Sequence, residues 1–314
     1  AFYNNITRNQ ILDVPMDQTT GYTKATMNSG KVRNRGIELQ LDGTPVKTKN
    51  FTWNSTFTWA KNYNKVLSLA AGLTDGQTIA YTGGTNCALI AKVGGSIGDI
   101  YGYKLKRAPD GQVVWKDGIT ARTTEFEYVG NAYPAWKAGF SNEFSYKNFR
   151  VSILFDGQWG GIVYSQTHHK MTEHGTLKHT LKYRENPNFE VVGEGVMLDE
   201  RGQYVPNNVP ISVSKYYADY WRRANVETNS FDASFLKLRE ARIEYTIPSA
   251  GLNKIGIERL TLALYGRNLA MWTKDFPVYD PEVATLNNGT IVPGSEMGQL
   301  PSTRTMGFNL TLKF

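Results

Sequence analysis

One pentapeptide in this 314-residue sequence matches a pattern that carries catalytic chemistry. Gly94-Gly95-Ser96-Ile97-Gly98 fits G-x-S-x-G, in which a nucleophilic serine is held on a sharp turn between a strand and a helix. The residues that follow, Asp99-Ile-Tyr-Gly-Tyr-Lys104, have the pattern of an extended segment rather than of a helix. We therefore predict a turn at Ser96, and no catalytic residue in the chain.

Four histidines, the most obvious metal ligands, crowd one stretch of the sequence at His168, His169, His174 and His179. Imidazoles bind transition metals, but the spacing lacks the H-E-x-x-H pattern and has no cysteine nearby. We expect a solvated polar loop here and no metal site.

Oxygen ligands for calcium are the third possibility. Asp280, Glu282 and Asn287 lie close together in sequence, yet the ordered acidic loop of a calcium site is missing. Asp280-Pro281 is typical of a turn, and a turn is the prediction. The chain is accordingly expected to be a non-enzyme without a cofactor or a metal.

Composition narrows the class of protein. Apolar residues make up 40% and aromatic residues 12%, there are 30 glycines, and Cys87 is the single cysteine. An internal disulfide and a cysteine-rich metal site are excluded. The net charge of +7 comes from scattered lysines and arginines, which argues against a nucleic-acid footprint. The sequence has no apolar run of about 18 residues, so it contains no spanning helix.

Alternation of apolar and polar residues is the strongest structural signal, because it is the period of a strand with two different faces. Near Arg239-Glu240 the alternation changes phase, which predicts a β-bulge. Eight segments alternate: about 1–12, 31–42, 51–62, 134–146, 149–159, 233–247, 257–268 and 304–314.

The connections between these segments alternate in length. Short ones span 43–50, 147–148 and 248–256, and long ones span about 13–30, 63–133, 160–232 and 269–303. Short turns on one side and long loops on the other are typical of outer-membrane barrels, with the long loops extracellular. The predicted fold is all-β, a transmembrane antiparallel β-barrel. Because the sequence starts without a methionine and as if inside a strand, we expect it to be the C-terminal portion of one longer barrel domain.

Several segments resemble the SusC/RagA family of TonB-dependent outer-membrane transporters. The most similar are 229–240, 264–269, 272–274, 280–282 and 301–308, which runs on to Phe314. Shorter matches are Asn34-Arg-Gly-Ile-Glu38, Asn62-Tyr-Asn-Lys-Val66, Gly98-Asp-Ile-Tyr-Gly-Tyr103 and Tyr133-Pro-Ala-Trp136.

The resemblance implies the last eight strands of a 22-stranded barrel with a plugged lumen. It implies multi-pass insertion in the bacterial outer membrane and energy-coupled import of an oligomeric nutrient, either a glycan fragment or a peptide. The implied partners are a SusD-like lipoprotein, the TonB complex through a preceding part of the protein, outer-membrane lipid and an oligosaccharide or oligopeptide cargo. A dimer of transporter–lipoprotein pairs is also implied, and no nucleic acid.

Three sets of residues receive expected roles. Loop aromatics could stack on sugar rings or hold peptide side chains, although an aromatic girdle or internal packing could equally explain them; they are Tyr101, Tyr103, Trp115, Trp159, Tyr164 and Trp272. Polar residues expected to face the lumen could line the transport path or brace the plug, and bracing is the favoured role; they are Arg150, Asp156, Gln158, Lys237 and Arg239. A terminal alternating strand resembles a barrel-assembly signal, formed by Phe308, Leu310, Leu312 and Phe314. We expect deletion of Phe314 to lower the amount of folded barrel in the membrane.

Two other functions remain open at this level. Eight strands can close into a small barrel used for adhesion or anchoring. A soluble all-β enzyme or carbohydrate-binding module would share the alternation but not the one-sided distribution of loop lengths.

Overall fold

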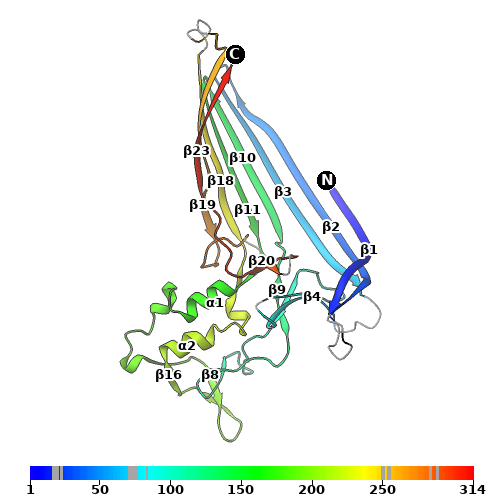
Figure 1. Ribbon diagram of the computed structural model, residues 1–314, viewed down its shortest axis with the longest axis vertical. Helices are drawn as coiled ribbons and strands as arrows, with labels where there is room; N and C mark the ends of the chain where they lie inside the picture. Colours follow the sequence, from blue (N-terminus) through cyan, green and yellow to red (C-terminus); the bar gives the residue numbers. More distant parts are fainter. Residues whose placement is uncertain are drawn as a thin grey trace.

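The computed structural model describes residues 1–15, 21, 24–69, 76–82, 84–248, 252, 256–282, 285–287 and 290–314. These residues form a tall eight-stranded sheet with a layer of short strands and helices at one end (Figure 1). In this part of the chain no helix is both long and apolar enough to cross a membrane.

Every segment predicted to be a strand is a strand of the large sheet. Each strand pairs antiparallel with the next large strand along the chain, so the order in the sheet is the order in the sequence. In the described ranges the first and the last of these strands are not paired with each other, so the eight strands form an open sheet and not a closed small barrel. The strands are β1 (Phe2–Pro15), β2 (Lys24–Lys47), β3 (Phe51–Ser68), β10 (Trp136–Tyr146), β11 (Phe149–Trp159), β18 (Phe235–Ile247), β19 (Arg259–Thr273) and β23 (Thr305–Lys313).

The register separates an apolar face from a polar one. Directly opposed residues share a face, and the opposed pairs include Phe140 with Phe155 and Leu262 with Leu310. This apolar face is exposed, with Phe308 78% accessible. An apolar surface that follows the whole sheet is what lipid contact requires.

The predicted bulge is present in β18. Against β11, Glu240 pairs with Leu154 and Leu238 with Phe155, so Arg239 is an extra residue between two adjacent partners. The pairing with β19 is also irregular here, since Leu238 pairs with Ala270 and Glu240 with Arg267. An extra residue in one strand re-aims side chains, and the phase change in the sequence has this cause.

Long and short connections lie at opposite ends of the sheet. The segments from β3 to β10, from β11 to β18 and from β19 to β23 all lie at one end, and the C-terminus lies at the other with the tight turn between β10 and β11 (Figure 1). The predicted loop at 13–30 is wrong in extent, because β1 continues to Pro15 and β2 begins at Lys24. A long hairpin replaces most of that loop, and part of its tip lies outside the described residues.

The long connections fold into a layer with its own sheets and helices, which we call the loop layer. Two helices pack against each other within it, α1 (Gln166–Glu173) and α2 (Val213–Tyr220). Its strands are β4 (Gln77–Thr82), β5 (Cys87–Ala91), β6 (Asp99–Gly102), β7 (Val114–Lys116), β8 (Ile119–Thr120), β9 (Glu127–Asn131), β12 (Ile162–Ser165), β13 (Glu190–Val192), β14 (Val196–Leu198), β15 (Tyr204–Pro206), β16 (Pro210–Ser212), β17 (Ser230–Asp232), β20 (Thr285–Asn287), β21 (Thr290–Val292) and β22 (Ser295–Glu296).

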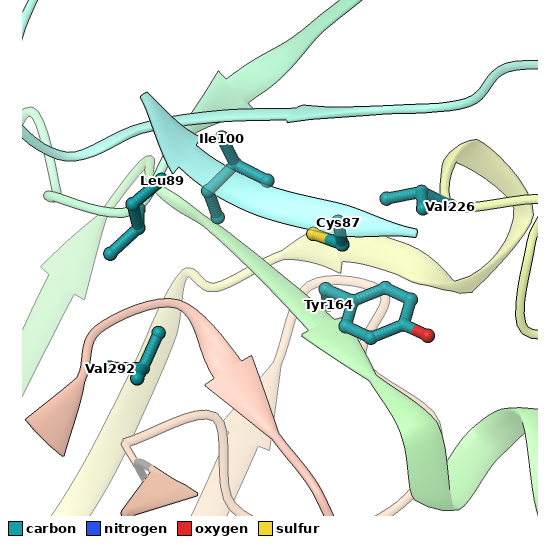
Figure 2. Close-up of a cluster of buried hydrophobic side chains, with 6 residues drawn as sticks. All are labelled: Cys87, Leu89, Ile100, Tyr164, Val226 and Val292. Atoms are coloured by element: carbon teal, nitrogen blue, oxygen red, sulfur yellow. The ribbon is translucent and has the colours of Figure 1, made fainter. Parts of the chain in front are cut away.

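Closed apolar clusters hold the loop layer together. One cluster gathers side chains from all three long connections, namely Cys87, Leu89, Ile100, Tyr164, Val226 and Val292 (Figure 2). A second lies beneath α2, around Trp115 and Tyr217. Segments that are far apart in sequence therefore share a common interior, as in a water-soluble domain.

Candidate functional site

The pentapeptide around Ser96 forms a turn, as predicted. The Ser96 backbone N–H donates to Asp99 Oδ2 at 2.8 Å, and the Ser96 hydroxyl donates to Asn64 Oδ1 at 3.1 Å. Strand β6 follows rather than a helix. The hydroxyl is thus a structural hydrogen-bonding group.

Two of the four histidines are packed inside the loop layer, so the predicted solvated loop is wrong for them, whereas His174 is exposed. His168 and His169 lie on α1 and are 2% and 5% exposed. Nδ1 of His168 is 2.9 Å from Asn229 Oδ1, and Nδ1 of His169 is 2.8 Å from the Trp221 carbonyl. Burial lowers the pKa of His168 to about 4. Neutral imidazoles that bond to an amide or a carbonyl can be buried without an unpaired charge, which the sequence pattern does not reveal.

Among the described residues there is no group of three or more histidine, cysteine, aspartate or glutamate side chains that could hold a metal ion. Glu282 donates its backbone N–H to Asp280 Oδ1 at 3.0 Å, which is the predicted turn. The side chain of Asn287 lies outside the described part of the structure.

The carboxylates of that turn are held by the sheet. Lys237 Nζ donates to both carboxylate oxygens of Asp280 at 2.7 Å and to Glu282 Oε2 at 2.5 Å. Lys237 is 2% exposed and Asp280 3%. Burial would raise the pKa of Asp280, but hydrogen bonds from Lys237 and Ser302 outweigh it and bring the pKa below its usual value. A paired ammonium and carboxylate satisfy each other in this dry position.

Arg239 extends the network along the polar face. Its guanidinium contacts Asp156 Oδ2 at 2.6 Å and Glu282 Oε2 at 2.6 Å. Three of the five residues expected to face the lumen, namely Asp156, Lys237 and Arg239, are therefore brought together. Lys237 and Arg239 bind the chain's own connection between β19 and β23, a contact that the sequence did not predict.

The other two residues of that set lie elsewhere on the wall. Gln158 Nε2 donates to the Ala233 carbonyl at 2.9 Å and so fixes the start of β18. Arg150 is 3.8 Å from Glu143, and both side chains are well exposed, at 53% and 36%. Arg150 remains available on the polar face.

A second buried carboxylate anchors the same connection to α1. Glu296 is fully buried and accepts from Ser165 Oγ and Thr167 Oγ1, each at 2.5 Å, and from the Tyr279 hydroxyl. Sequence reasoning missed Glu296, because a glutamate between serine and methionine has no recognisable spacing. The segment from Tyr279 to Glu296 is thus tied at one end to the sheet and at the other to the loop layer.

Two of the loop aromatics are enclosed. Trp115 is 1% exposed, stacks on Tyr216 and Tyr220, and donates its indole N–H to the Glu194 carbonyl at 2.9 Å. Tyr164 is fully buried at the centre of the cluster in Figure 2. Their burial supports packing roles, and we do not propose them as ligand contacts.

Tyr101 and Tyr103 are half-buried and paired with other rings. Tyr101 meets Tyr128 edge-on at 5.7 Å, and Tyr103 meets Phe126 edge-on at 4.8 Å. Cations lie over both, since Lys92 is 4.5 Å from the Tyr101 ring and Arg122 is 4.3 Å from the Tyr103 ring. These contacts also favour internal packing.

Trp159 and Trp272 stand on the apolar face where the sheet meets the loop layer. They are 51% and 54% exposed, and Trp159 stacks on Trp136 at 6.3 Å. Both line a groove of about 440 Å³ with Phe140 and Phe155. Their exposure on this face is consistent with an aromatic girdle, the alternative to ligand binding that the sequence offered.

Known proteins match this chain over its whole length. No protein-family model matches it. TonB-dependent receptors P26 and P3 of Formosa agariphila are 29% and 24% identical over the whole chain, which covers 32% of each receptor. TonB-dependent receptor SusC of Bacteroides thetaiotaomicron is 26% identical over 44% of the chain and 15% of SusC. The chain is related to TonB-dependent receptors of the SusC/RagA type.

Solved structures show the same fold. The structure of the RagAB peptide transporter matches all of the chain with a TM-score of 0.68 at 20% identity. The RagAB peptide importer in the "closed-closed" state matches with a TM-score of 0.69 at 21% identity. In each case the chain covers 33% of the matched chain. The chain thus spans about a third of the length of its relatives.

The last strand, β23, carries the residues of the expected assembly signal. Phe308, Leu310 and Leu312 lie on the apolar face of β23, and Phe314 follows the strand. All are exposed, with Phe308 and Phe314 each 78% accessible. Their common face leaves them open to lipid or to another protein.

Proposed function

We propose that the whole protein imports an oligomeric nutrient across the bacterial outer membrane in a TonB-dependent manner. One observation supports this best: an open sheet with an apolar and a polar face carries all its long connections folded at one end. A wall of that kind suits part of a large barrel with lipid outside and a polar interior. The strands would cross the membrane several times, and the loop layer would lie outside the cell.

A SusD-like surface lipoprotein is the proposed partner. The loop layer supports this proposal because its buried apolar clusters give it a folded structure. A folded surface of this kind suits the binding of another protein. The TonB complex would act through a part of the whole protein outside these 314 residues, and pairs of transporter and lipoprotein would form dimers. The cargo would be a glycan fragment or a peptide, and the protein would not be an enzyme.

Uptake by cells tests this function. We expect cells that lack the gene to lose uptake of one labelled oligomer, and the full-length gene to restore it. Collapse of the proton gradient should abolish the restored uptake, because coupling through TonB needs that energy. Unchanged uptake in the deletion strain across both glycan and peptide libraries would contradict the proposal. Co-purification of a lipoprotein with the full-length protein tests the partner separately.

A further inference from the structure

A polar cavity opens where two neighbouring strands separate. Strands β3 and β10 are paired from Phe51 with Tyr146 up to Ala60 with Lys137, and β3 then continues without β10. A cavity of about 360 Å³ lies in this fork. It is lined by Tyr3, Ala60, Lys61, Asn62, Tyr63, Asn64, Ser96, Asn131, Tyr133, Pro134, Trp136 and Lys137.

Two tyrosine side chains that line this cavity pack directly against glycine residues. A Cβ atom at Gly36 would lie 2.5 Å from the Tyr3 hydroxyl, and one at Gly98 would lie 2.6 Å from the Tyr133 ring. Only a residue without a side chain lets each ring lie so close to the backbone. The glycines thus fix two aromatic surfaces beside one cavity, and such surfaces pack against the C–H face of a sugar ring.

Three asparagine side chains around the cavity differ in how their amide groups are hydrogen-bonded. Asn64 Nδ2 donates to Asn34 Oδ1 at 2.8 Å, and Asn131 Nδ2 donates to Asp99 Oδ1 at 2.7 Å, so both amides hold the frame. Asn62 differs, because its Oδ1 accepts from the Tyr3 hydroxyl at 3.0 Å while its Nδ2 is 3.5 Å from Asn34 Oδ1. That distance is too long for a strong bond, so the Asn62 amide can donate to a ligand.

The charge of the lining is positive. Lys61 and Lys137 are its ionised residues, and neither forms an ion pair with a carboxylate in the described part of the chain. Lys61 Nζ lies 4.8 Å from the Tyr63 ring. Glu38 and Asp156 line an adjoining hollow that also reaches Lys137. A ligand with a negative group is favoured at this site.

Four segments that are far apart in sequence supply the cavity, and they are the short matches on which the family resemblance partly rests. The segment from Asn34 to Glu38 contains Gly36, against which Tyr3 packs, and the segment from Gly98 to Tyr103 begins with Gly98, against which Tyr133 packs. The segment from Asn62 to Val66 provides two of the amides, and the segment from Tyr133 to Trp136 lines the cavity. These segments place two tyrosine rings and the amides beside one cavity.

We propose that the cavity is a subsite for an acidic sugar residue of the cargo. Tyr3 and Tyr133 stack on the ring, Asn62 donates to a hydroxyl, and Lys137 pairs with the carboxylate or sulfate. This inference rests on the proposed import function and adds a substrate class to it, an anionic oligosaccharide.

Binding to the full-length protein in detergent tests the inference by calorimetry. The probes are an oligogalacturonate, a neutral malto-oligosaccharide and an acidic peptide, all of similar length. We expect the oligogalacturonate to bind best and Lys137→Gln to weaken it by about tenfold, since a charge-assisted bond is lost. Asn62→Ala should weaken it by about fivefold. Lys147→Gln, at the tight turn at the opposite end of the sheet, is the matched control and should change nothing.

Two results would overturn the inference. One is equal binding of the charged and neutral sugars, with no effect of Lys137→Gln. The other is loss of peptide binding alone in Lys137→Gln, which would assign the site to peptides. Either result leaves import itself untouched if energy-dependent uptake of another oligomer persists, so the two proposals fail separately. Lys137 and Asn62 are not part of a buried core, and unchanged thermal unfolding of both variants will confirm that they fold.

Discussion

Two tryptophans show how differently the sheet and the loop layer are built. Trp115 in the loop layer is 1% exposed and enclosed by tyrosines, whereas Trp159 in the sheet is 51% exposed on the apolar face. The loop layer buries its aromatic residues among its own elements, as a protein in water must. The sheet presents them outward. The distribution of apolar side chains in this chain therefore suits water at one end of the sheet and lipid along the strands.

The treatment of charge differs in the same way. Along the sheet, charged pairs such as Arg150 with Glu143 are exposed on the polar face. Where the sheet meets the connection from β19, Lys237 and Asp280 are almost completely buried. We conclude that buried charge fixes the border between the two regions.

Removing the cation at the border should have the largest effect. Lys237→Met leaves the carboxylate of Asp280 buried without its partner, at a cost of up to about 5 kcal/mol. We expect the connection between β19 and β23 to become sensitive to protease in the folded full-length protein. Arg150→Met is the control, and its exposed pair should matter by less than about 1 kcal/mol. Equal protection of that connection in both variants would show that the buried network does not hold it.

Truncation of the two tryptophans compares the regions directly. Trp115→Ala should destabilise the loop layer by about 3–4 kcal/mol, because it opens a cavity and leaves the Glu194 carbonyl unpaired. Trp159→Ala should leave the loop layer unchanged. Hydrogen exchange of amides in α2 reports the difference. Similar exchange rates in the two variants would contradict the view that Trp115 stabilises the loop layer and Trp159 does not.

An arginine introduced into β23 should cost more stability on the apolar face than on the polar face. Leu310→Arg places a cation on the apolar face and should reduce stability in a bilayer by about 2–4 kcal/mol. Thr311→Arg, the next residue, points to the polar face and should cost far less. Refolding of the full-length protein into vesicles at increasing urea concentration gives both values. A larger cost at Thr311 would mean that the two faces have been assigned the wrong way round.

Acid should loosen the loop layer before the sheet. The pKa of His168 is lowered by burial to about 4 from an ordinary value near 6.5. Between these values the unfolded state binds more protons, so stability falls as the pH drops through this window, by about 3 kcal/mol for one such group. Hydrogen exchange of α1 measured from pH 7 to pH 4, corrected for intrinsic rates, checks this. His168→Gln should flatten the dependence, and an unchanged slope would assign it to other groups.

The sheet could be predicted because its information is local. Alternation along 149–159 or 304–314 fixes which side chains share a face, and the phase change at Arg239 fixes the bulge. The extent of the first hairpin was not predictable in this way, because β1 and β2 continue through residues with no clear alternation. Their pairing with each other extends the strands where the pattern does not.

The loop layer could not be predicted, because its order depends on partners far along the chain. His168 is buried beside Asn229, and Glu296 beside Ser165 and Thr167. No spacing pattern in the sequence predicts which residue each of them contacts. The candidate site was therefore only half foreseen: Asp156, Lys237 and Arg239 were placed on the polar face, but the carboxylates that hold Lys237 and Arg239 there were interpreted only as a turn.

The central claim is that one face of the sheet meets lipid and the other does not, and cysteine scanning of β10 tests it most directly. Single cysteines at positions 136 to 144 of the full-length protein in a bilayer would carry a fluorophore, while buried Cys87 stays protected. We predict that labels at 138, 140 and 144 are quenched by lipid-borne quenchers, and labels at 137, 141 and 143 are not. Uniform quenching along the strand, or quenching with the opposite phase, would contradict the account.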